Sequence, residues 1–379
     1  MAIILYDLRV HYIGVLMSIV SSESKVLKIL QRVRENFPKN FEHRIGVDTE
    51  EVLRVLVEDF TRGEYSFGDY TSILVPLESL TYYECNRFDA SREGAVSYLV
   101  SERVSVLAFD GSVHGFGAHF YVPLTIVNLG YWYQNYGVND NGFGNEAAVI
   151  PEIATPSVRR VESKKAEYVL LEGIVDRLVS DFRIVLYDES FNLRYTLSWD
   201  VKTRNDFLKI FEDHINGISS RGIVPVAVFY TSASDIIRGY NSKKGGKKKF
   251  DVEIPDKFLM NRFLNIGARS NLFKVYTRSL ANTKLDIVAF YLKISENNVI
   301  RVEFPQKFES LVDKIHCTVL AQAILGEGYP LAMQRAHEWA VLTHQDRLLI
   351  EEEIAKLLGK PYADMFYSAK LRSKRRPIS

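Results

Sequence analysis

Three apolar segments alternate with amphipathic segments in the middle of the chain, and this alternation limits the possible folds more than any other feature. The apolar segments VSVLAFDGS, RIVLYDES and IVPVAVFY begin at residues 104, 183 and 223. Between them, KKAEYVLLEGIVDRLVSDF (164–182) and RNDFLKIFEDHINGI (204–218) carry apolar residues at helical spacing. Strands that are apolar on both faces need a cover of helices, so the pattern predicts an α/β fold.

The flanking segments predict further elements around this sheet. Apolar spacing predicts two helices within residues 17–60 and further strands over 119–133 and 285–305. Residues 308–325 and 331–359 read as helices, whereas residues 65–106 give only short β-like runs. The apolar N-terminus is interrupted by charges and ends at Val20, so a buried strand or helix is expected there rather than a membrane span or targeting signal.

The composition is that of a folded protein with a substantial core. The 48 basic and 47 acidic side chains leave a net charge of +1, and 47% of the residues are hydrophobic. This excludes a uniformly polybasic arm or a disordered acidic chain, and it predicts one large domain with elaborations or two domains. Cys85 and Cys317 lie far apart in sequence and are interpreted as ordinary core residues in a reducing cytoplasm.

Several familiar catalytic motifs are missing from the sequence. It has no GxxxxGK[ST] phosphate loop, no dinucleotide fingerprint after a strand and no nucleophile elbow. His337 and His344 lie too far apart for a zincin, whose histidines are one helical turn apart. ATP hydrolysis and zinc-dependent proteolysis are therefore not expected.

Three carboxylates remain as candidates for chemistry. Asp110 and Asp188 end two predicted strands, and Glu172 lies at the border of the apolar face of the helix before the second strand. Carboxylates that converge at strand ends make a site for a hard cation such as Mg²⁺ or Mn²⁺. The alternative is that the aspartates form turns or cap helices and that Glu172 is a solvated charge.

Three blocks of the sequence resemble, in order and spacing, the NurA nuclease family of archaea and some bacteria. They are VSVLAFDGSVHGFGAHFYVPL, YVLLEGIVDRLVSDFRIVLYDESF and GYPLAMQRAHEWAVLTHQDRLLIEEE. The resemblance covers roughly residues 100–355 and implies an RNase H-like mixed sheet flanked by helices, with N-terminal and C-terminal elaborations. It also implies a homodimer that uses Mn²⁺ or Mg²⁺ to cut single- and double-stranded DNA, as a 5′–3′ exonuclease and single-strand endonuclease. Such nucleases resect broken DNA ends for recombination and repair with the hexameric translocase HerA.

Carried over to this chain, the resemblance implies Asp110, Glu172 and Asp188 as metal ligands. It implies His337 as an active-site residue that orients phosphate or assists metal binding, although a histidine on an apolar helix stripe is also a common packing residue. Two departures stand out: Glu189 replaces the glycine after the second aspartate, and Tyr230 lies near the position of a lysine in many relatives. They leave open a catalytically weakened DNA-binding or translocase-docking scaffold. An RNase H-like enzyme acting on RNA or on junctions is the third alternative.

Candidate DNA contacts lie outside these blocks. Basic clusters bind phosphate without sequence preference, and aromatic rings stack on unpaired bases. The candidates are the lysines of the loop NSKKGGKKKF (Lys243, Lys244, Lys247, Lys248 and Lys249) and the aromatic residues Trp132 and Tyr133. A solvated surface for the lysines, and core or dimer packing for the aromatics, are the alternatives. The expected organisation is an elaboration over 1–100, a nuclease domain over 101–360 and a basic tail over 361–379.

Overall fold

The computed structural model describes residues 32, 49–66, 68, 70–116, 124–151, 156–246, 249–251 and 253–358. The chain divides into two compact units, Met1–Val52 and Leu53–Ser379, and nearly all of the first unit lies outside the described residues. The expected domain boundary near residue 100 falls inside the second unit. The apolar N-terminus, Lys247, Lys248 and the basic tail also lie outside the described residues.

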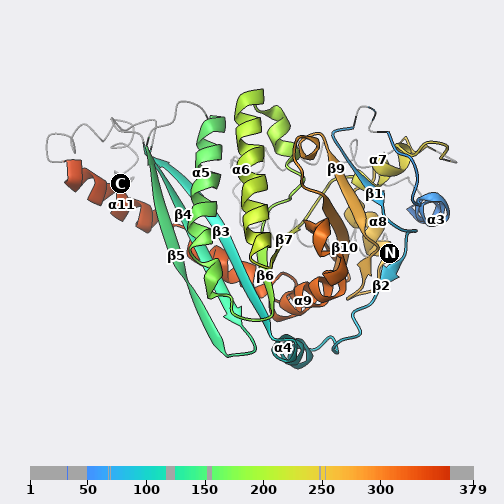
Figure 1. Ribbon diagram of the computed structural model, residues 1–379, viewed down its shortest axis with the longest axis horizontal. Coiled ribbons are helices and arrows are strands. Elements are labelled where there is room, and N and C mark those ends of the chain that lie inside the picture. The colour runs from blue at the N-terminus through green and yellow to red at the C-terminus, as the bar shows by residue number, and fades with distance from the viewer. Residues whose placement is uncertain are drawn as a thin grey trace. The chain divides into compact units, whose positions relative to one another are not determined.

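A single sheet of 11 strands runs through the described part of the second unit (Figure 1). Its path is β1-β9-β10-β11-β7-β6-β3-β4-β5, and β2 and β8 join it beside β10. The strands are β1 (Ser72–Pro76), β2 (Tyr82–Tyr83), β3 (Val104–Phe116), β4 (Leu124–Asn135), β5 (Asp140–Pro151), β6 (Phe182–Tyr187), β7 (Ile223–Phe229), β8 (Arg269–Ser270), β9 (Phe273–Thr277), β10 (Ile287–Ser295) and β11 (Asn298–Pro305).

The five strands β5-β4-β3-β6-β7 form the predicted RNase H-like core. β3, β4 and β5 are an antiparallel meander, while β6 lies parallel to β3 and β7 parallel to β6. The last pair between β3 and β6 joins Phe109 to Tyr187, and β3 continues to Phe116. On the other side, β11 is antiparallel to β7 and leads through β10 and β9 to the edge strand β1. The predicted N-terminal elaboration therefore supplies two strands, β1 and β2, to the main sheet.

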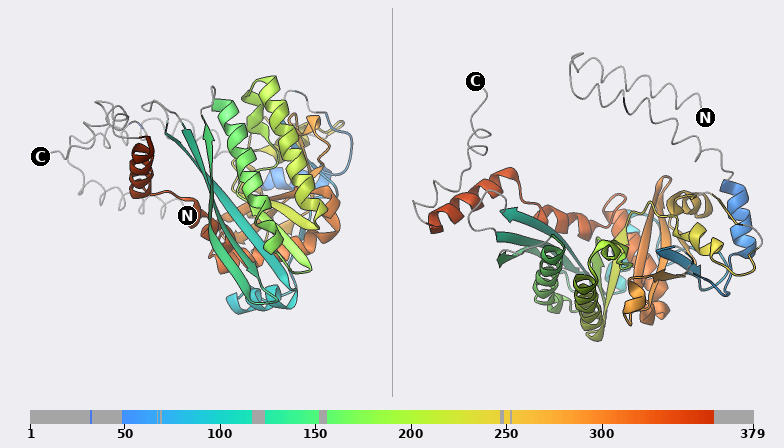
Figure 2. Two further views of the ribbon diagram at one scale, coloured as in Figure 1. Left: turned by 60° about the vertical axis from the view of Figure 1, so that its left-hand side comes forward. Right: turned by 90° about the horizontal axis from the view of Figure 1, so that it is seen from above.

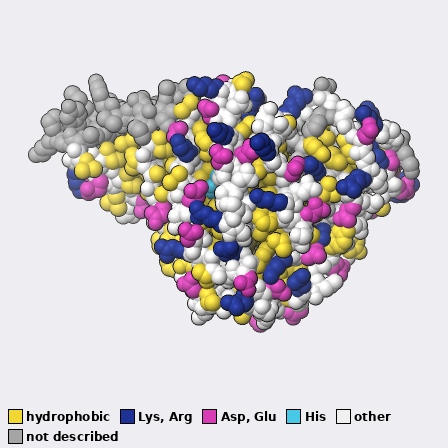
Figure 3. Space-filling model, viewed as in Figure 1, with side chains coloured by type: hydrophobic (Ala, Val, Ile, Leu, Met, Phe, Trp, Pro, Cys, Tyr) yellow, Lys and Arg dark blue, Asp and Glu magenta, His cyan; other side chains and the backbone are white. Residues whose placement is uncertain are grey.

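Helices cover both faces of this sheet (Figure 2). α5 and α6 pack against each other on one face, and α4, α9 and α10 lie on the other. The helices are α3 (Thr49–Asp59), α4 (Arg92–Ser101), α5 (Pro156–Glu172), α6 (Val201–Ser220), α7 (Asp235–Asn241), α8 (Asp256–Phe263), α9 (Val312–Leu325), α10 (Leu331–Ala340) and α11 (His344–Leu358). No helix in the described residues is both long enough and apolar enough to cross a membrane. The face with α5 and α6 displays basic and acidic side chains intermixed (Figure 3).

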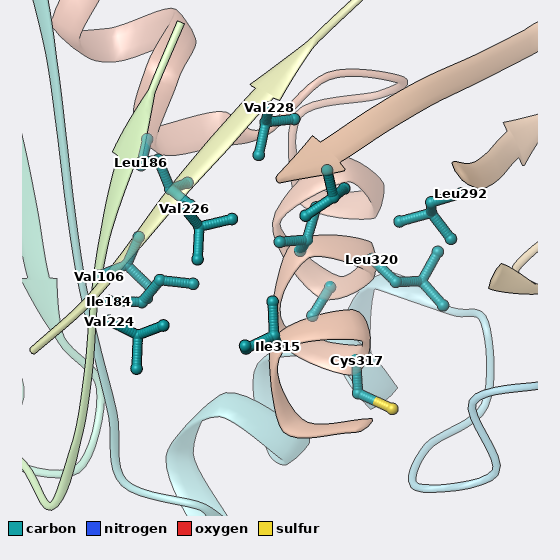
Figure 4. Close-up of a cluster of buried hydrophobic side chains, with 14 of the residues drawn as sticks. Val106, Ile184, Leu186, Val224, Val226, Val228, Leu292, Ile315, Cys317 and Leu320 are labelled. Atoms are coloured by element: carbon teal, nitrogen blue, oxygen red, sulfur yellow. The ribbon is translucent and has the colours of Figure 1, made fainter. Parts of the chain in front are cut away.

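The core follows from the alternation of side chains along the central strands. Val106, Ile184 and Val226 are buried in one cluster with Ile315 of α9 (Figure 4). Neighbouring residues point to the other face, where the ring of Tyr187 lies 4.8 Å from that of Phe109. Full burial of each such side chain contributes roughly 1.5–3 kcal/mol, so the two-sided cover accounts for the predicted α/β fold.

Several predicted helix limits need correction. The helix predicted over 164–182 ends at Glu172, where Gly173 is followed by a short 3-10 turn, η1 (Val175–Arg177). The helix predicted over 331–359 is two helices, because Val341 has extended backbone angles and Thr343 caps the second one. In that cap, Thr343 Oγ1 accepts from the Asp346 N–H, and the Asp346 side chain accepts from the Thr343 N–H. With α5 placed at Pro156–Glu172, both central helices and the three apolar strands of the prediction are present.

The interpretation of the cysteines as unpaired core residues is wrong. Cys85 and Cys317 form a disulfide across 232 residues of sequence, with Cα atoms 5.7 Å apart. Cys317 lies in the core on α9, and Cys85 lies in the segment that leads into α4. The sheet brings these distant segments together, which sequence separation alone does not reveal.

Candidate active site

Asp110 and Asp188 occupy neighbouring positions on β3 and at the end of β6. Phe109 pairs with Tyr187, so the two aspartates are the next residues along each parallel strand. Both side chains lie on the α10 face: Asp110 contacts His337, and Asp188 accepts a hydrogen bond from Tyr329 at 2.7 Å. Desolvation raises the pKa of the Asp188 carboxyl, the Tyr329 hydrogen bond opposes this, and the Asp110 carboxylate raises the pKa again.

The helix α10 brings His337 to Asp110. A Cβ atom on Gly130 of β4 would lie 2.2 Å from the Ala340 backbone, so this glycine allows the helix to lie against the strand. Asn128 donates to the Ala340 carbonyl at 2.9 Å, which satisfies an orphan acceptor at the helix end. His337 Nδ1 lies 2.6 Å from Asp110 Oδ2, and its side chain is 65% exposed. The imidazole of His337 is therefore positioned by Asp110 and remains accessible to solvent.

Tyr329 is a site residue that the sequence pattern did not identify. It belongs to the GYP block, but the resemblance assigns no role to its hydroxyl. Its ring stacks on Tyr230 with centroids 5.6 Å apart, and Tyr230 in turn donates to the Gly328 carbonyl. Tyr230 thus supports Tyr329, the hydrogen-bond donor to Asp188. The GYP motif (328–330) was the sequence signal that could have pointed to Tyr329.

The α5 carboxylate nearest the aspartates is Glu167, not the predicted Glu172. Glu167 is buried, and a Cβ atom on Gly111 would lie 2.4 Å from its Oε1, which explains the glycine after Asp110. Burial raises the pKa of Glu167, the ammonium of Lys164 opposes this, and the carboxylate of Glu189 raises it again. Lys164 Nζ lies 2.7 Å from Glu167 and 3.1 Å from Glu189.

Glu172 lies at the other end of α5, five residues further on. Its carboxylate is half-exposed and lies 3.9 Å from His214 Nδ1. Its backbone carbonyl accepts from Arg221. The structure thus brings Asp110, Asp188 and His337 together on one face and leaves Glu172 outside that group.

The loop after β6 is held from within the sheet by Glu303 of β11. Glu303 is fully buried, and its Oε2 accepts from the Ser190 hydroxyl at 2.9 Å and from the Phe191 N–H at 2.7 Å. Its other oxygen is paired with the buried Arg301 at 2.6 Å. This buried pair fixes the two residues that directly follow Asp188 and Glu189.

The acidic groups suit a hard divalent cation in type. Among the described residues, no three carboxylate or histidine side chains stand close enough together to hold a metal. Mg²⁺, however, is commonly bound by one or two carboxylates together with water and substrate phosphate. Asp110 and Asp188 supply such a pair, and Glu189 Oε1 is a buried oxygen without a hydrogen-bond partner. These residues therefore fit the predicted cofactor in their chemistry.

The predicted DNA contacts have mostly structural partners. Tyr133 is 6% exposed, and Trp132 packs against the core. The amine of Lys243 lies 3.0 Å from Asp59, and that of Lys244 lies 3.0 Å from Glu64. Lys249 is exposed. These contacts favour the packing and solvated-surface alternatives over stacking or phosphate binding.

Fold and site together define an RNase H-like protein with an acidic centre where its parallel strands end. Within that class, residues 201–342 match the family model of the NurA domain. This match confirms, over the residues that it covers, the resemblance to the NurA family seen in the sequence. The matched range includes Tyr329 and His337, while Asp110, Glu167 and Asp188 precede it.

Solved structures of low sequence identity are also similar to this chain. The NurA nuclease from Sulfolobus solfataricus is 14% identical, with a TM-score of 0.48 over 92% of this chain and 99% of that chain. NurA bound to dAMP and manganese is 12% identical, with a TM-score of 0.36 over 88% and 96%. Endonuclease V of Ciona intestinalis in complex with DNA is 12% identical, with a TM-score of 0.29 over 79% and 96%. No curated protein sequence matches the chain.

Proposed function

We propose that this protein is a metal-dependent DNA nuclease, a phosphodiesterase. The observation that carries the proposal is the adjacency of Asp110 and Asp188 at the strand ends of an RNase H-like sheet, in a chain with a NurA domain. Solved NurA structures contain manganese, one of them together with dAMP. Mn²⁺ or Mg²⁺ is accordingly the proposed cofactor, and DNA the proposed substrate.

Asp110 and Asp188 would hold the ion, with Glu167 as a third carboxylate close to the same strand end. When bound, such an ion activates water and offsets charge on a phosphodiester. Donation from His337 Nδ1–H to Asp110 leaves Nε2 of the exposed ring as a proton acceptor beside the substrate. Tyr329 holds the Asp188 carboxylate through its hydroxyl. The proposed role of each group can thus be tested by a substitution that removes a single functional group or charge.

Substitution of the carboxylates tests the proposal and separates Glu167 from Glu172. We expect Asp110→Asn to abolish Mn²⁺-dependent cleavage of end-labelled single- and double-stranded DNA. Glu167→Gln should reduce the rate roughly a hundred-fold, because a metal ligand contributes several kcal/mol of transition-state stabilisation. Glu172→Gln, on the same helix, should stay near the wild-type rate.

The assay also includes EDTA as a control for metal dependence. Cleavage by Asp110→Asn at the wild-type rate would refute the nuclease proposal. Loss of activity in Glu172→Gln but not in Glu167→Gln would instead restore the ligand set that the sequence predicts.

The finer proposal places this nuclease in the cytoplasm, in the resection of DNA double-strand breaks with a HerA-type translocase. There it would act as a homodimer, a 5′–3′ exonuclease and a single-strand endonuclease. Family resemblance supports the partner and the polarity. Exposed apolar residues support a protein interface: Phe143 on the edge strand β5 is 56% exposed and stacks on Trp339, while Leu349 and Leu357 of α11 are 56% and 86% exposed. Sedimentation of the purified chain tests the dimer.

A catalytically weakened scaffold is the second candidate, because Lys164 already forms ion pairs with Glu167 and Glu189 without a metal ion. It predicts DNA binding without cleavage in Mn²⁺ or Mg²⁺. Titration of the protein with Mn²⁺ separates the two functions, since the nuclease should bind the ion and Asp110→Asn should bind it less well.

A further inference from the structure

A cavity of about 470 Å³ opens beside the acidic centre, between α5, β3 and the loop that follows β6. It shares Glu167 and Glu189 with that centre, and Val113 of β3 lines it three residues beyond Asp110. Pairing between β3 and β6 ends at Tyr187, so Val113 lies on the part of β3 that extends beyond β6. Its volume is within the usual range for small-molecule sites.

Several polar groups that line the cavity have no hydrogen-bond partner in the part of the chain that the structure describes. Within the described residues, neither Arg159 nor Arg160 forms a hydrogen bond or an ion pair with its side chain, and Arg159 Nε is a buried donor without a partner. Ser163 is 3% exposed, and its hydroxyl also has no partner. Buried polar groups normally have hydrogen-bond partners, so Arg159 Nε and the Ser163 hydroxyl are suited to a ligand, and Arg160 lies exposed on the same wall. Two guanidinium groups favour an anion with several oxygens, such as a phosphate.

Two aromatic rings form another wall of the same cavity. Tyr195 is 40% exposed, and its ring centroid lies 5.6 Å from that of Trp199. Trp199 is partly buried, and its ring packs edge-to-face against that of Phe207, with centroids 5.3 Å apart. Because its neighbours already restrict the motion of the Trp199 ring, stacking on a planar group in the cavity costs little side-chain entropy.

We propose that this cavity binds one unpaired nucleotide of the DNA strand, next to the phosphodiester at the acidic centre. Arg159 and Arg160 bind its phosphate, and Trp199 with Tyr195 stacks on its base. A base inside a duplex cannot reach the rings, because both of its faces are already stacked. The proposal rests on the proposed nuclease function and adds that the chain selects unpaired DNA at this position.

Binding in the absence of catalysis tests the cavity directly. The probe is a short fluorescein-labelled oligothymidylate, titrated with the full chain in EDTA and followed by fluorescence anisotropy. We expect Arg159→Gln together with Arg160→Gln to weaken binding about ten-fold and to reduce the slope of log affinity against log salt by about 0.7 for each phosphate that is no longer neutralised. Trp199→Leu should also weaken binding about ten-fold, and Trp199→Phe should restore most of it.

Matched controls use residues that do not line the cavity. Arg62→Gln removes an exposed arginine, and Tyr82→Leu removes a 42% exposed ring on β2. Neither should change oligothymidylate binding, and blunt duplex DNA should be far less sensitive to Trp199→Leu. The cavity proposal is overturned if the arginine and tryptophan variants bind oligothymidylate as the wild type does, or if duplex binding falls equally.

The same proteins separate this proposal from the proposed function. If oligothymidylate binding depends on Arg159, Arg160 and Trp199 but no metal supports cleavage, the nuclease fails and the nucleotide site stands. If cleavage depends on Asp110 but binding and the Michaelis constant are unchanged in the cavity variants, the nuclease stands and the nucleotide site fails. Thermal unfolding of each variant shows whether weaker binding reflects a loss of folding.

Discussion

The imidazole of His316 makes the stability of this protein depend on pH. It is 1% exposed on α9, and its Nε2–H donates to the Gly267 carbonyl at 2.8 Å. Burial lowers the pKa of His316 to about 4, against about 6.5 in an unfolded chain. The unfolded chain therefore takes up a proton first as the pH falls, and stability is lost between about pH 6.5 and pH 4.

The variant His316→Gln isolates this effect from other titrating groups. Between pH 7 and pH 5, we expect the free energy of unfolding of the wild type to fall by about 2 kcal/mol relative to that of the variant. Urea titrations of both proteins at the two pH values measure the difference. If the difference in free energy of unfolding between the two proteins is the same at both pH values, His316 binds the proton equally well in the folded and unfolded chains.

Sequence patterns predicted part of the candidate site, and the omissions have physical reasons. Asp110, Asp188 and His337 could be found because each occupies a fixed place at a strand end or in a helical block. Glu167 could not be separated from Glu172, because both lie on one helix and only the distance of α5 from Gly111 decides between them. The role of Tyr329 depends on a contact across 141 residues, which no local pattern encodes.

Among the elements, the loop between β6 and α6 depends on a residue of another strand. Glu303 accepts hydrogen bonds from Ser190 and Phe191, so it positions the chain directly after Asp188. We expect Glu303→Gln to keep the fold but to raise the Mn²⁺ concentration needed for half-maximal cleavage. Glu303→Ala should also lose about 3 kcal/mol of stability, because it leaves the buried Arg301 with one partner fewer.

A matched buried acid shows whether the effect is specific to the loop. Asp256 is fully buried and accepts from the Ile236 N–H and from the Tyr291 hydroxyl, away from the loop. Asp256→Asn should lower stability without changing the Mn²⁺ dependence of cleavage. An equal change in Mn²⁺ dependence in both variants would mean that Glu303 has only a structural role.

Element types were easier to predict than element limits. The central strands and the helices between them follow from apolar spacing, because each element is buried on a regular face. β5 was missed since it contains Gly142 and Gly144, whose missing side chains make room for the rings of Tyr133 and Tyr131. The limits of α5 and α10 depend on local backbone changes at Gly173 and Val341, which periodicity does not resolve.

The whole molecule is cross-linked by one bond between distant segments. The disulfide between Cys85 and Cys317 closes a loop of 232 residues that contains most of the sheet. By loop-closure entropy, such a bond stabilises the folded chain by about 5 kcal/mol. We expect reduction under denaturing titration to lower the free energy of unfolding by an amount of this order.

The control is the double variant Cys85→Ala with Cys317→Ala. It should show the lower stability without reductant and no further change with it. Equal stability of the oxidised and reduced wild-type protein would contradict the expected contribution. Mass spectrometry after alkylation establishes which redox state was measured.

The contact between Asp110 and His337 spans 227 residues of sequence, and this separation sets an order of events during synthesis. A ribosome releases the strands with both aspartates long before it reaches α10. The growing chain can therefore build the acidic pair, but not its imidazole partner, before α10 has been translated. Ribosome-bound chains that stop before residue 331 would therefore carry an incomplete centre.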